Sequence, residues 1–321
     1  MPESTPLGSA PLGSTPAPRA ASALPLLVML VTPLFFSSNL IFGRLAIPEV
    51  APFTLAFLRW AGAALVLLPW VLSSRPRVAA YLTSHWRHWL LLGFLGMWIC
   101  GGVVYLGLEY TTATNGTLIY TTSPLMILII ERLFNGRRIA LREMAGIIVG
   151  FIGVAIIVLR GSPVALFSLD FNFGDILFIV CALSWAIYSV LLKGPRTAGL
   201  PVLTLFGLVA LSGALLLAPM AAYEFFSGAR MPVTASAWTG IAGIIVFASL
   251  LAFSGFQYGV ARLGASTAGV FMYLLPPYGV GLAVFVLGEP FETYHAVGIA
   301  TVLGGLVLAT AKRPQRVRPT A

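Results

Sequence analysis

Charged residues are scarce in this chain of 321 residues: Asp, Glu, Lys and Arg together make up 9% of it, whereas hydrophobic residues make up 59%. A soluble domain of this length could not bury so much apolar surface. There are only two cysteines and three histidines. Cys100 and Cys181 fall in different apolar stretches without metal-ligand spacing, so neither a disulfide nor a metal site is expected. A phosphate-binding loop is also missing, which argues against ATP as the energy source.

Long apolar runs dominate what is present, and the mean hydropathy is +0.95. About twenty apolar residues, rising 1.5 Å each, cross a hydrocarbon core ~30 Å thick, so each run predicts a membrane-spanning helix. The runs are continuous, unlike the alternating strands of a membrane barrel. We therefore predict an all-α integral membrane protein with ten spans, and nine or eleven spans are alternatives because the third and fourth nearly touch at Tyr110–Thr111. The predicted spans cover residues 24–45, 51–72, 88–109, 112–133, 142–160, 173–193, 201–223, 237–260, 263–287 and 293–311.

The basic residues predict the orientation. With a cytoplasmic N-terminus, fifteen of the 19 Lys and Arg residues fall inside, three fall outside, and Arg59 lies within the second span. This asymmetry follows the positive-inside rule and predicts a multi-pass protein of the cell (inner or plasma) membrane with both termini cytoplasmic. The isoelectric point near 10.0 then reflects loops that face anionic lipid, not a nucleic-acid partner.

The two ends of the chain differ from the apolar region between them. Residues 1–23 are rich in Pro, Ser, Ala and Gly and are predicted to be disordered, with a cleaved signal peptide as the alternative. Residues 312–321 are predicted to form a basic cytoplasmic tail.

The chain also contains an internal repeat. Shifted by about 152 positions, residues 108–160 align with 260–312 without a gap, and Pro124 then matches Pro276. This divides the apolar region into two halves, residues 24–160 and 173–311, of five spans each. Because five is odd, the second half must enter the membrane from the opposite side. Inverted repeats around a central site are typical of alternating-access transport, with a purely structural duplication as the alternative.

Several short motifs occur in a characteristic order along the spans. They are Ser38–Asn39, Pro52 with Leu58–Arg59, Pro124, Gly146, Gly153, Ala182–Leu183–Ser184–Trp185–Ala186–Ile187–Tyr188, Pro276 and Gly288–Glu289–Pro290. In their order and spacing these motifs resemble the drug/metabolite transporter superfamily, EamA type, over nearly all of residues 24–311. The resemblance implies a ten-helix carrier with its cavity between the halves, often an exporter of amino acids or related small metabolites. Arg137 departs from the family pattern, which usually has an acid there.

Polar and aromatic residues recur at helical spacing in spans one, three, four, six, eight and nine, and we expect these faces to line a substrate cavity. A buried amide is costly in lipid unless it has partners or water, and aromatic rings provide a large contact area with few rotatable bonds. Ordinary helix packing is the alternative for each residue. The candidates are Asn39, Trp98, Tyr105, Tyr120, Trp185, Tyr188, Phe253 and Tyr273.

The positions of proline and glycine predict which helices bend during gating and which pack as a fixed scaffold. Pro124 and Pro276 occupy matched positions and are candidate gating hinges, with static kinks as the alternative. Spans five and ten carry small residues that favour close helix packing, so we expect them to form a scaffold or a dimer surface and not the cavity. The small residues are Gly146, Gly150, Gly153, Gly298 and Gly304–Gly305.

Charge inside the spans is limited to a few candidates. Arg59 and Glu109 lie toward the same side, which predicts a structural ion pair; the alternative is a binding site for a substrate carboxylate at Arg59. Glu131 is expected to pair with Arg132 or Arg137. The spans contain no deep pair of acids or histidines of the kind that indicates a proton relay. This absence favours uniport or exchange and leaves proton coupling through Glu109 or Glu131 open.

We therefore predict a secondary transporter, not an enzyme, that exports a small metabolite without a cofactor. An amino acid or related zwitterion is the favoured substrate, and the lipid bilayer is the expected environment, whereas the sequence leaves monomer and homodimer undetermined. A multidrug or other-metabolite efflux carrier is the alternative, and a non-transporting membrane protein is a weaker one. An integral-membrane enzyme would need clustered acids or histidines, but the one close pair, His85 and His88, has no acid near it in sequence.

Overall fold

The computed structural model describes residues 23–167 and 171–311. Residues 1–22 of the predicted disordered segment and the predicted basic tail, 312–321, lie outside the described part. Within it, ten helices are long and apolar enough to cross a membrane, as the sequence predicts. In chain order the spans are α1 (Leu24–Ser37) with α2 (Asn39–Ala46); α3 (Pro52–Ser73); α4 (Arg75–Gly93) with η1 (Phe94–Val103) and α5 (Val104–Gly107); α6 (Ala113–Tyr120) with α7 (Ser123–Asn135); α8 (Leu141–Val158); α9 (Phe173–Leu191); α10 (Val202–Phe226); α11 (Ala235–Gly243) with η3 (Ile244–Leu251) and α12 (Ala252–Leu263); α13 (Ala265–Phe271) with η4 (Met272–Leu274) and α14 (Leu275–Leu287); and α15 (Thr293–Thr310). A short 3₁₀ turn, η2 (Pro163–Leu166), lies between α8 and α9.

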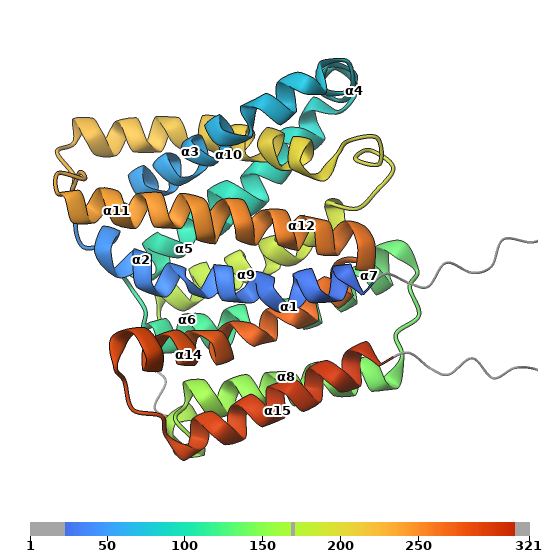
Figure 1. Ribbon diagram of the computed structural model, residues 1–321, viewed down its shortest axis with the longest axis vertical. Helices are drawn as coiled ribbons and strands as arrows, with labels where there is room; N and C mark the ends of the chain where they lie inside the picture. The colour runs from blue at the N-terminus through green and yellow to red at the C-terminus, as the bar shows by residue number, and fades with distance from the viewer. Residues whose placement is uncertain (1–22, 168–170, 312–321) are drawn as a thin grey trace, which may run out of the picture.

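The two halves are inverted relative to each other. In Figure 1, α1 begins and α15 ends on the right, which we call the terminal side, whereas α8 ends and α9 begins on the left. Each half therefore crosses from one side to the other, in opposite directions, as the odd number of spans predicts.

The halves also share their irregularities. The third span of each contains a π-helix, η1 in the first half and η3 in the second. The fourth span of each is broken, and Pro124 and Pro276 stand in the first turn of the segment that follows each break. Proline suits that position because the first-turn N–H groups of a helix have no partner within the helix. These matched deviations from a regular α-helix support the repeat that the sequence shift indicates.

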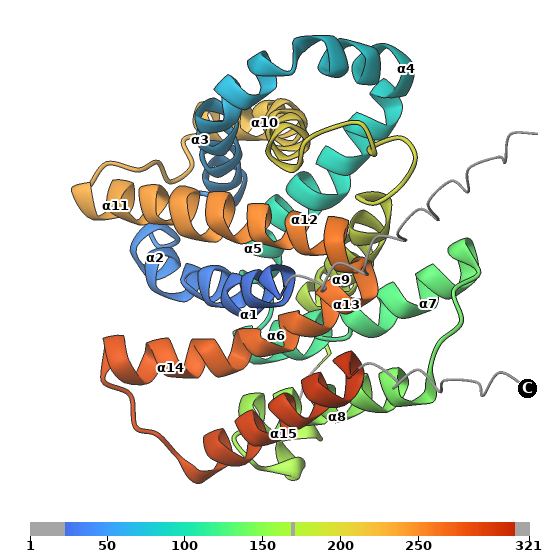
Figure 2. The same cartoon turned by 45° about the vertical axis from the view of Figure 1, so that its right-hand side comes forward.

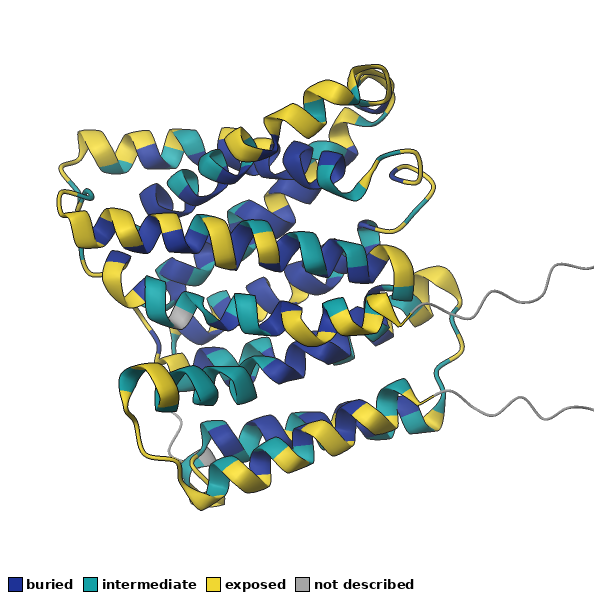
Figure 3. Ribbon diagram, viewed as in Figure 1, coloured by how far each residue is buried: buried dark blue, intermediate teal, exposed yellow. Residues whose placement is uncertain are grey.

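Equivalent helices pair at the two edges of the bundle. The α3–α10 pair lies at one edge, with α4 packed on α10, and the α8–α15 pair lies at the other (Figures 1 and 2). Between these edges the first span packs on α12 and α14 of the second half, while α9 packs on η1 and α7 of the first half. Figure 3 shows that buried residues concentrate in these central helices. The centre is therefore the interface between the halves.

Glycine allows the close approach of α8 and α15. A Cβ on Gly305 would collide with the backbone of Gly146 and Gly150, and one on Gly153 would meet the backbone at Val302. Small residues at such contacts are typical of helices that pack tightly in lipid. This confirms close packing of spans five and ten, which lie away from the cavity described below. Gly304, in contrast, faces open space.

The third span differs from its prediction. The helix begins at Arg75, not near residue 88, so the expected loop after span two is helical, with a kink at His85. The basic and polar residues of this segment hide it from a search for apolar runs, while proline in its first turn favours helix initiation. Residues 108–112 form a turn, which separates the third and fourth spans and resolves the nine-span alternative.

Candidate functional site

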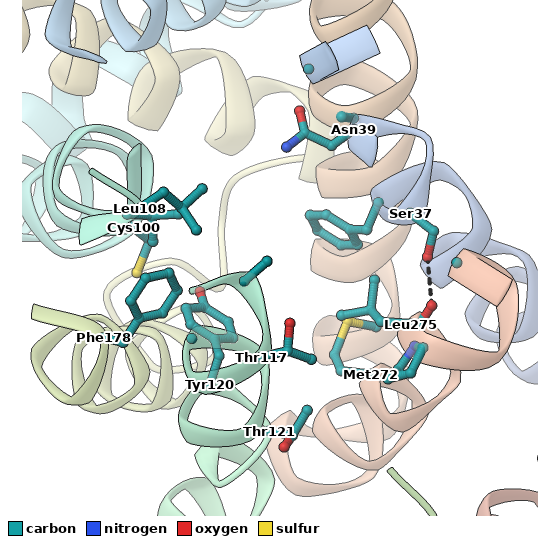
Figure 4. Close-up of a pocket in the computed structure, with 18 of the residues that line it drawn as sticks. Ser37, Asn39, Cys100, Leu108, Thr117, Tyr120, Thr121, Phe178, Met272 and Leu275 are labelled. Carbon is teal, nitrogen blue, oxygen red and sulfur yellow. Dashed lines mark hydrogen bonds between the residues drawn. The ribbon is translucent and has the colours of Figure 1, made fainter. Parts of the chain in front are cut away.

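A cavity of about 730 Å³ lies between the two halves. Its lining comes from spans one, three, four, six, eight and nine, the six that the sequence predicts, and from Arg59 of α3. Figure 4 shows Leu108, Cys100 and Tyr120 from the first half on one side, with Met272 and Leu275 of the second half across the cavity. This volume falls within the range that buries a small molecule.

The inner end of the cavity is aromatic. The Trp185 ring lies 6.0 Å from Phe36, 6.4 Å from Tyr120 and 5.6 Å from Phe253, between ring centroids. Tyr273 also lines the cavity, and its buried hydroxyl has no hydrogen-bond partner among the described residues. This surface suits an apolar or aromatic group and leaves a polar group on each tyrosine for orientation.

The cavity extends to the side opposite the terminal side. Arg44, Ile47 and Pro48 follow the first span to its far end, and Leu108 and Ala113 flank the turn between spans three and four on that same side; all five line the cavity. The Arg44 side chain is 53% exposed and pairs with Glu289 at 3.3 Å. We call this end the mouth.

On the terminal side the cavity is closed by α7. This helix packs on α9 and α13, and its residues Ile127 and Leu128 are fully buried. Beyond them Glu131 accepts hydrogen bonds from Ser266 of α13 and from Arg137, whose guanidinium lies 3.0 Å from it.

Arg137 also pairs with Glu143 at 2.8 Å. We call Glu131, Arg137, Glu143 and Ser266 the inner cluster. The expected pairing of Glu131 with Arg137 is confirmed.

The equivalent helix of the second half, α14, is packed much less tightly. It has no buried residue. Two hydrogen bonds fasten it to α1: the Ser37 hydroxyl donates to the Leu275 carbonyl at 2.9 Å, and the Tyr278 hydroxyl donates to the Leu30 carbonyl at 2.8 Å. Because α7 and α14 are repeat equivalents, this difference records a molecule open at the mouth and closed on the terminal side.

The expected ion pair between Arg59 and Glu109 is wrong. Glu109 lies at the surface and pairs with Arg230 at 2.9 Å. The Arg59 side chain turns inward instead, where its Nε donates to the Ser249 hydroxyl at 2.7 Å and one terminal nitrogen donates to the Ala248 carbonyl at 2.8 Å. The π-helix η3 supplies both acceptors. Residues in π-helical turns are frequently found at functional sites.

The structure brings most of the candidate residues to one cavity. Its lining includes Asn39, Arg59, Tyr120, Pro124, Trp185, Phe253, Tyr273 and Pro276. The other candidates do not line it: Trp98, Tyr105, Glu109, Glu131 and Tyr188.

The residues off the cavity have other contacts. Trp98 is half-buried against Phe53 and Phe94. Tyr188 is fully buried, and its hydroxyl accepts a bond from Gln257 at 3.0 Å. Tyr105 lies directly behind the lining, as described below for Arg59.

The face of the third span that lines the cavity was misread. Helical spacing groups Trp98, Gly101, Tyr105 and Glu109, but the lining residues are Cys100, Val104 and Leu108, which lie one position earlier at the same spacing. Both sets recur with helical period in an apolar span, so periodicity alone does not separate the two neighbouring faces.

Other lining residues were accessible to sequence reasoning. Phe178 lines the cavity seven positions before Trp185, on the same face of α9, so two helical turns from Trp185 would have indicated it. Met272 lines the cavity beside Tyr273, at the 3₁₀ turn η4 of the ninth span. No cluster of His, Cys, Asp and Glu suited to a metal ion occurs within the described residues.

Comparisons with known proteins agree with this architecture. The model of the EamA-like transporter family matches the chain twice, over residues 23–159 and 172–311. An uncharacterized transporter of Archaeoglobus fulgidus is 30% identical over 297 residues, which cover 90% of this chain and 98% of the relative. The uncharacterized transporter YetK of Bacillus subtilis is 28% identical over 87% of this chain and 84% of its own length.

Two further matches are a curated protein and a solved structure. A probable terminal-alkyne amino-acid exporter of Streptantibioticus cattleyicolor is 25% identical over 71% of this chain and 74% of its own length. A solved crystal structure superposes with a TM-score of 0.73 at 20% identity, over 91% of this chain and 98% of its own, and so has the same fold.

Proposed function

Because the chain belongs to the EamA-like transporter family, we propose that it exports a small metabolite, an amino acid or related zwitterion, by alternating access. The chain is a multi-pass membrane protein. We propose further that it lies in the cell (inner or plasma) membrane with both termini cytoplasmic, on the strength of the charge asymmetry of its loops. The mouth of the cavity then faces outside, where an exporter releases its substrate.

One observation carries this proposal: a small-molecule cavity lies between two inverted halves, open at one side only. Inverted repeats are related by an approximate two-fold axis in the membrane plane, so each half can adopt the packing that the other half has on the opposite side. The two units that move are taken to be residues 24–160 and 173–311. A structural protein would have no use for an apolar cavity of this size at the interface of its repeats.

The helices α7 and α14 are proposed to control which side of the cavity is open. In the state described, α7 has buried residues and closes the terminal side, while α14 at the mouth has none and is held to α1 by two hydrogen bonds. If α14 packs and α7 releases, the cavity opens to the other side. Pro124 and Pro276 stand where these helices begin, so they are proposed as the gating hinges. Each bend can change there without breaking a backbone hydrogen bond, because proline has no N–H to lose.

The charges near the cavity support uniport or exchange over proton coupling. Its lining contains no Asp or Glu. Glu109 is at the surface with Arg230, and Glu131 lies in the inner cluster, outside the lining. Glu131 is the one acid within α7 and α14, and it is the residue to examine if a proton gradient proves necessary.

Counterflow in proteoliposomes tests the proposal. Vesicles loaded with unlabelled amino acids should accumulate a labelled one without any pH gradient. Tyr120→Ala removes a lining ring and should reduce the rate at least about tenfold, the effect of losing one well-packed aromatic contact on a bound ligand. Trp98→Ala removes a ring of comparable size away from the cavity and serves as the matched control. Accumulation only with a pH gradient would contradict uniport, and no accumulation of any amino acid would contradict the substrate class.

A further inference from the structure

Arg59 is a cation buried in the membrane-spanning part without an anion. It is 6% exposed and lines the cavity. The carboxylates of Glu109, Glu131, Glu143 and Glu289 pair with other arginines, and no salt bridge to Arg59 occurs within residues 23–167 and 171–311. An unpaired buried charge is strongly destabilising, and ionisable groups inside a membrane usually serve a substrate or ion pathway.

Neutral groups hold this cation in place without neutralising it. Besides its bonds to Ser249 and Ala248, its remaining terminal nitrogen donates to the Tyr105 hydroxyl at 3.3 Å. The guanidinium carbon lies 4.5 Å from the Trp60 ring centroid and 5.5 Å from that of Phe253. A guanidinium has five N–H groups, so these three bonds leave two for another acceptor.

Tyr105 is a positioning residue in this arrangement. Its hydroxyl receives the bond from Arg59 and donates to the Asn39 side-chain oxygen at 3.4 Å. Asn39 lines the cavity from the first span. The chain from Asn39 through Tyr105 to Arg59 therefore ties the direction of the guanidinium to the cavity wall.

The rest of the lining indicates what the cation binds. The charged residues of the lining are Arg44 at the mouth and Arg59 deeper in, both positive, and the lining has no carboxylate for an ammonium group. Tyr273 of the other half also lines the cavity, and its hydroxyl is buried without a partner among the described residues. Arginine matches the geometry of a carboxylate, to which it donates two parallel bonds.

We propose that Arg59 binds the carboxylate of the transported metabolite, and that recognition depends on this carboxylate and not on an amino group. The substrate class is thus an organic acid with an apolar or aromatic body, in which an α-amino group is tolerated but not required. This inference rests on the proposed function and replaces its zwitterion with the wider class of organic acids. We expect organic cations to bind poorly in the cavity, because the unpaired charge of Arg59 would repel them.

Three probes with one aromatic body test the inference by equilibrium binding to the full chain in nanodiscs. L-phenylalanine carries both groups, 3-phenylpropionate carries the carboxylate alone, and L-phenylalaninamide carries the amine alone. We expect the two acids to bind within about threefold of each other and the amide to bind at least about tenfold more weakly, as the loss of a charge-assisted hydrogen bond predicts.

Variants of Arg59 assign the preference to this side chain. Arg59→Lys keeps the charge but loses the planar fork, and should weaken acid binding by about tenfold or more. Arg59→Gln should remove the preference for acids over the amide. Arg87→Gln, which removes an exposed arginine from α4, should leave all three affinities unchanged. Gel filtration shows whether each variant is folded.

The outcomes separate this inference from the proposed function. The inference is overturned if the amide binds as tightly as the acids, if Arg59→Gln keeps the preference, or if no probe binds. If another solute then shows counterflow that is indifferent to Arg59, the transport proposal stands alone. If the acids bind through Arg59 but no metabolite is exchanged, the carboxylate site stands and the transport proposal falls.

Discussion

Replacing Glu131 with Gln should increase the fraction of molecules that are open on the terminal side. Glu131 of α7 accepts a hydrogen bond from Ser266 of α13, and this contact joins two helices that must separate when the terminal side opens. The pair with Arg137 lies within one connection, six residues away, and can persist in both states. The Ser266 contact is therefore the part of the inner cluster that distinguishes the states.

The size of the effect follows from that one contact. A hydrogen bond to a charged group contributes about 1.5–3 kcal/mol, whereas the neutral bond that Gln can still form contributes about 0.5–1.5 kcal/mol. The difference of about 1–2 kcal/mol corresponds to a change of about 5–30-fold in the ratio of the two states. The Arg137 pair adds little to this figure, because the Arg137 side chain is 36% exposed and solvent screens the interaction.

Thiol labelling measures this ratio. Thr117 lines the cavity and is half-buried, so Thr117→Cys in a background lacking Cys100 and Cys181 places one thiol there. A membrane-impermeant reagent added on the terminal side reaches it only in molecules open to that side. When molecules open to the terminal side are the minority, the labelling rate is proportional to their fraction. Glu131→Gln should therefore raise the rate by about 5–30-fold, as the difference between the two hydrogen bonds predicts.

Two variants make the result decisive. Ser266→Ala should raise the rate in the same direction, and combining it with Glu131→Gln should add little, because both remove one contact. Arg132→Gln, on the same turn of α7 but exposed, should leave the rate unchanged. Unchanged labelling in both Glu131→Gln and Ser266→Ala would refute the inner cluster as a contact that holds the terminal side closed.

The remaining predictions concern stability, each measured as the thermal unfolding midpoint in detergent. Gly305→Ala should destabilise the protein by about 1–3 kcal/mol, because the new methyl group meets the Gly150 backbone. Gly304 faces open space, so the control Gly304→Ala should not lower the midpoint. Equal midpoints for the two variants would contradict the α8–α15 packing. Asp175→Ala should cost about 2–4 kcal/mol, because the carboxylate caps α9 and accepts the Thr111 hydroxyl at 2.6 Å. A midpoint within a degree of wild type would show that the Asp175–Thr111 contact does not fasten the turn before α6 to α9.

The sequence determines the architecture because lipid imposes a simple length rule. Apolar runs and loop charges locate the spans, and the shift that pairs Pro124 with Pro276 identifies the two halves. The prediction failed for the cavity face of the third span. The lining residues Cys100, Val104 and Leu108 recur at the same helical spacing as the predicted face, and composition does not distinguish two neighbouring faces of an apolar helix.

The partners of Arg59 were also beyond sequence reasoning. Glu109 is a plausible partner by depth, but the choice between it and the Ser249 hydroxyl depends on how α3 and η3 are rotated against each other. The sequence likewise does not show which side of the cavity is open. The helices α7 and α14 are equivalent in the repeat, yet they are packed differently in this structure.

A reversible cross-link on the terminal side tests the central claim most directly. Glu131→Cys and Ser266→Cys, combined in the background lacking Cys100 and Cys181, would be bridged by a short bifunctional thiol reagent with a reducible spacer. Alternating access predicts that the bridge stops counterflow, that reduction restores it, and that neither single variant responds to the reagent. Undiminished counterflow with the bridge fully formed would contradict transport through this cavity.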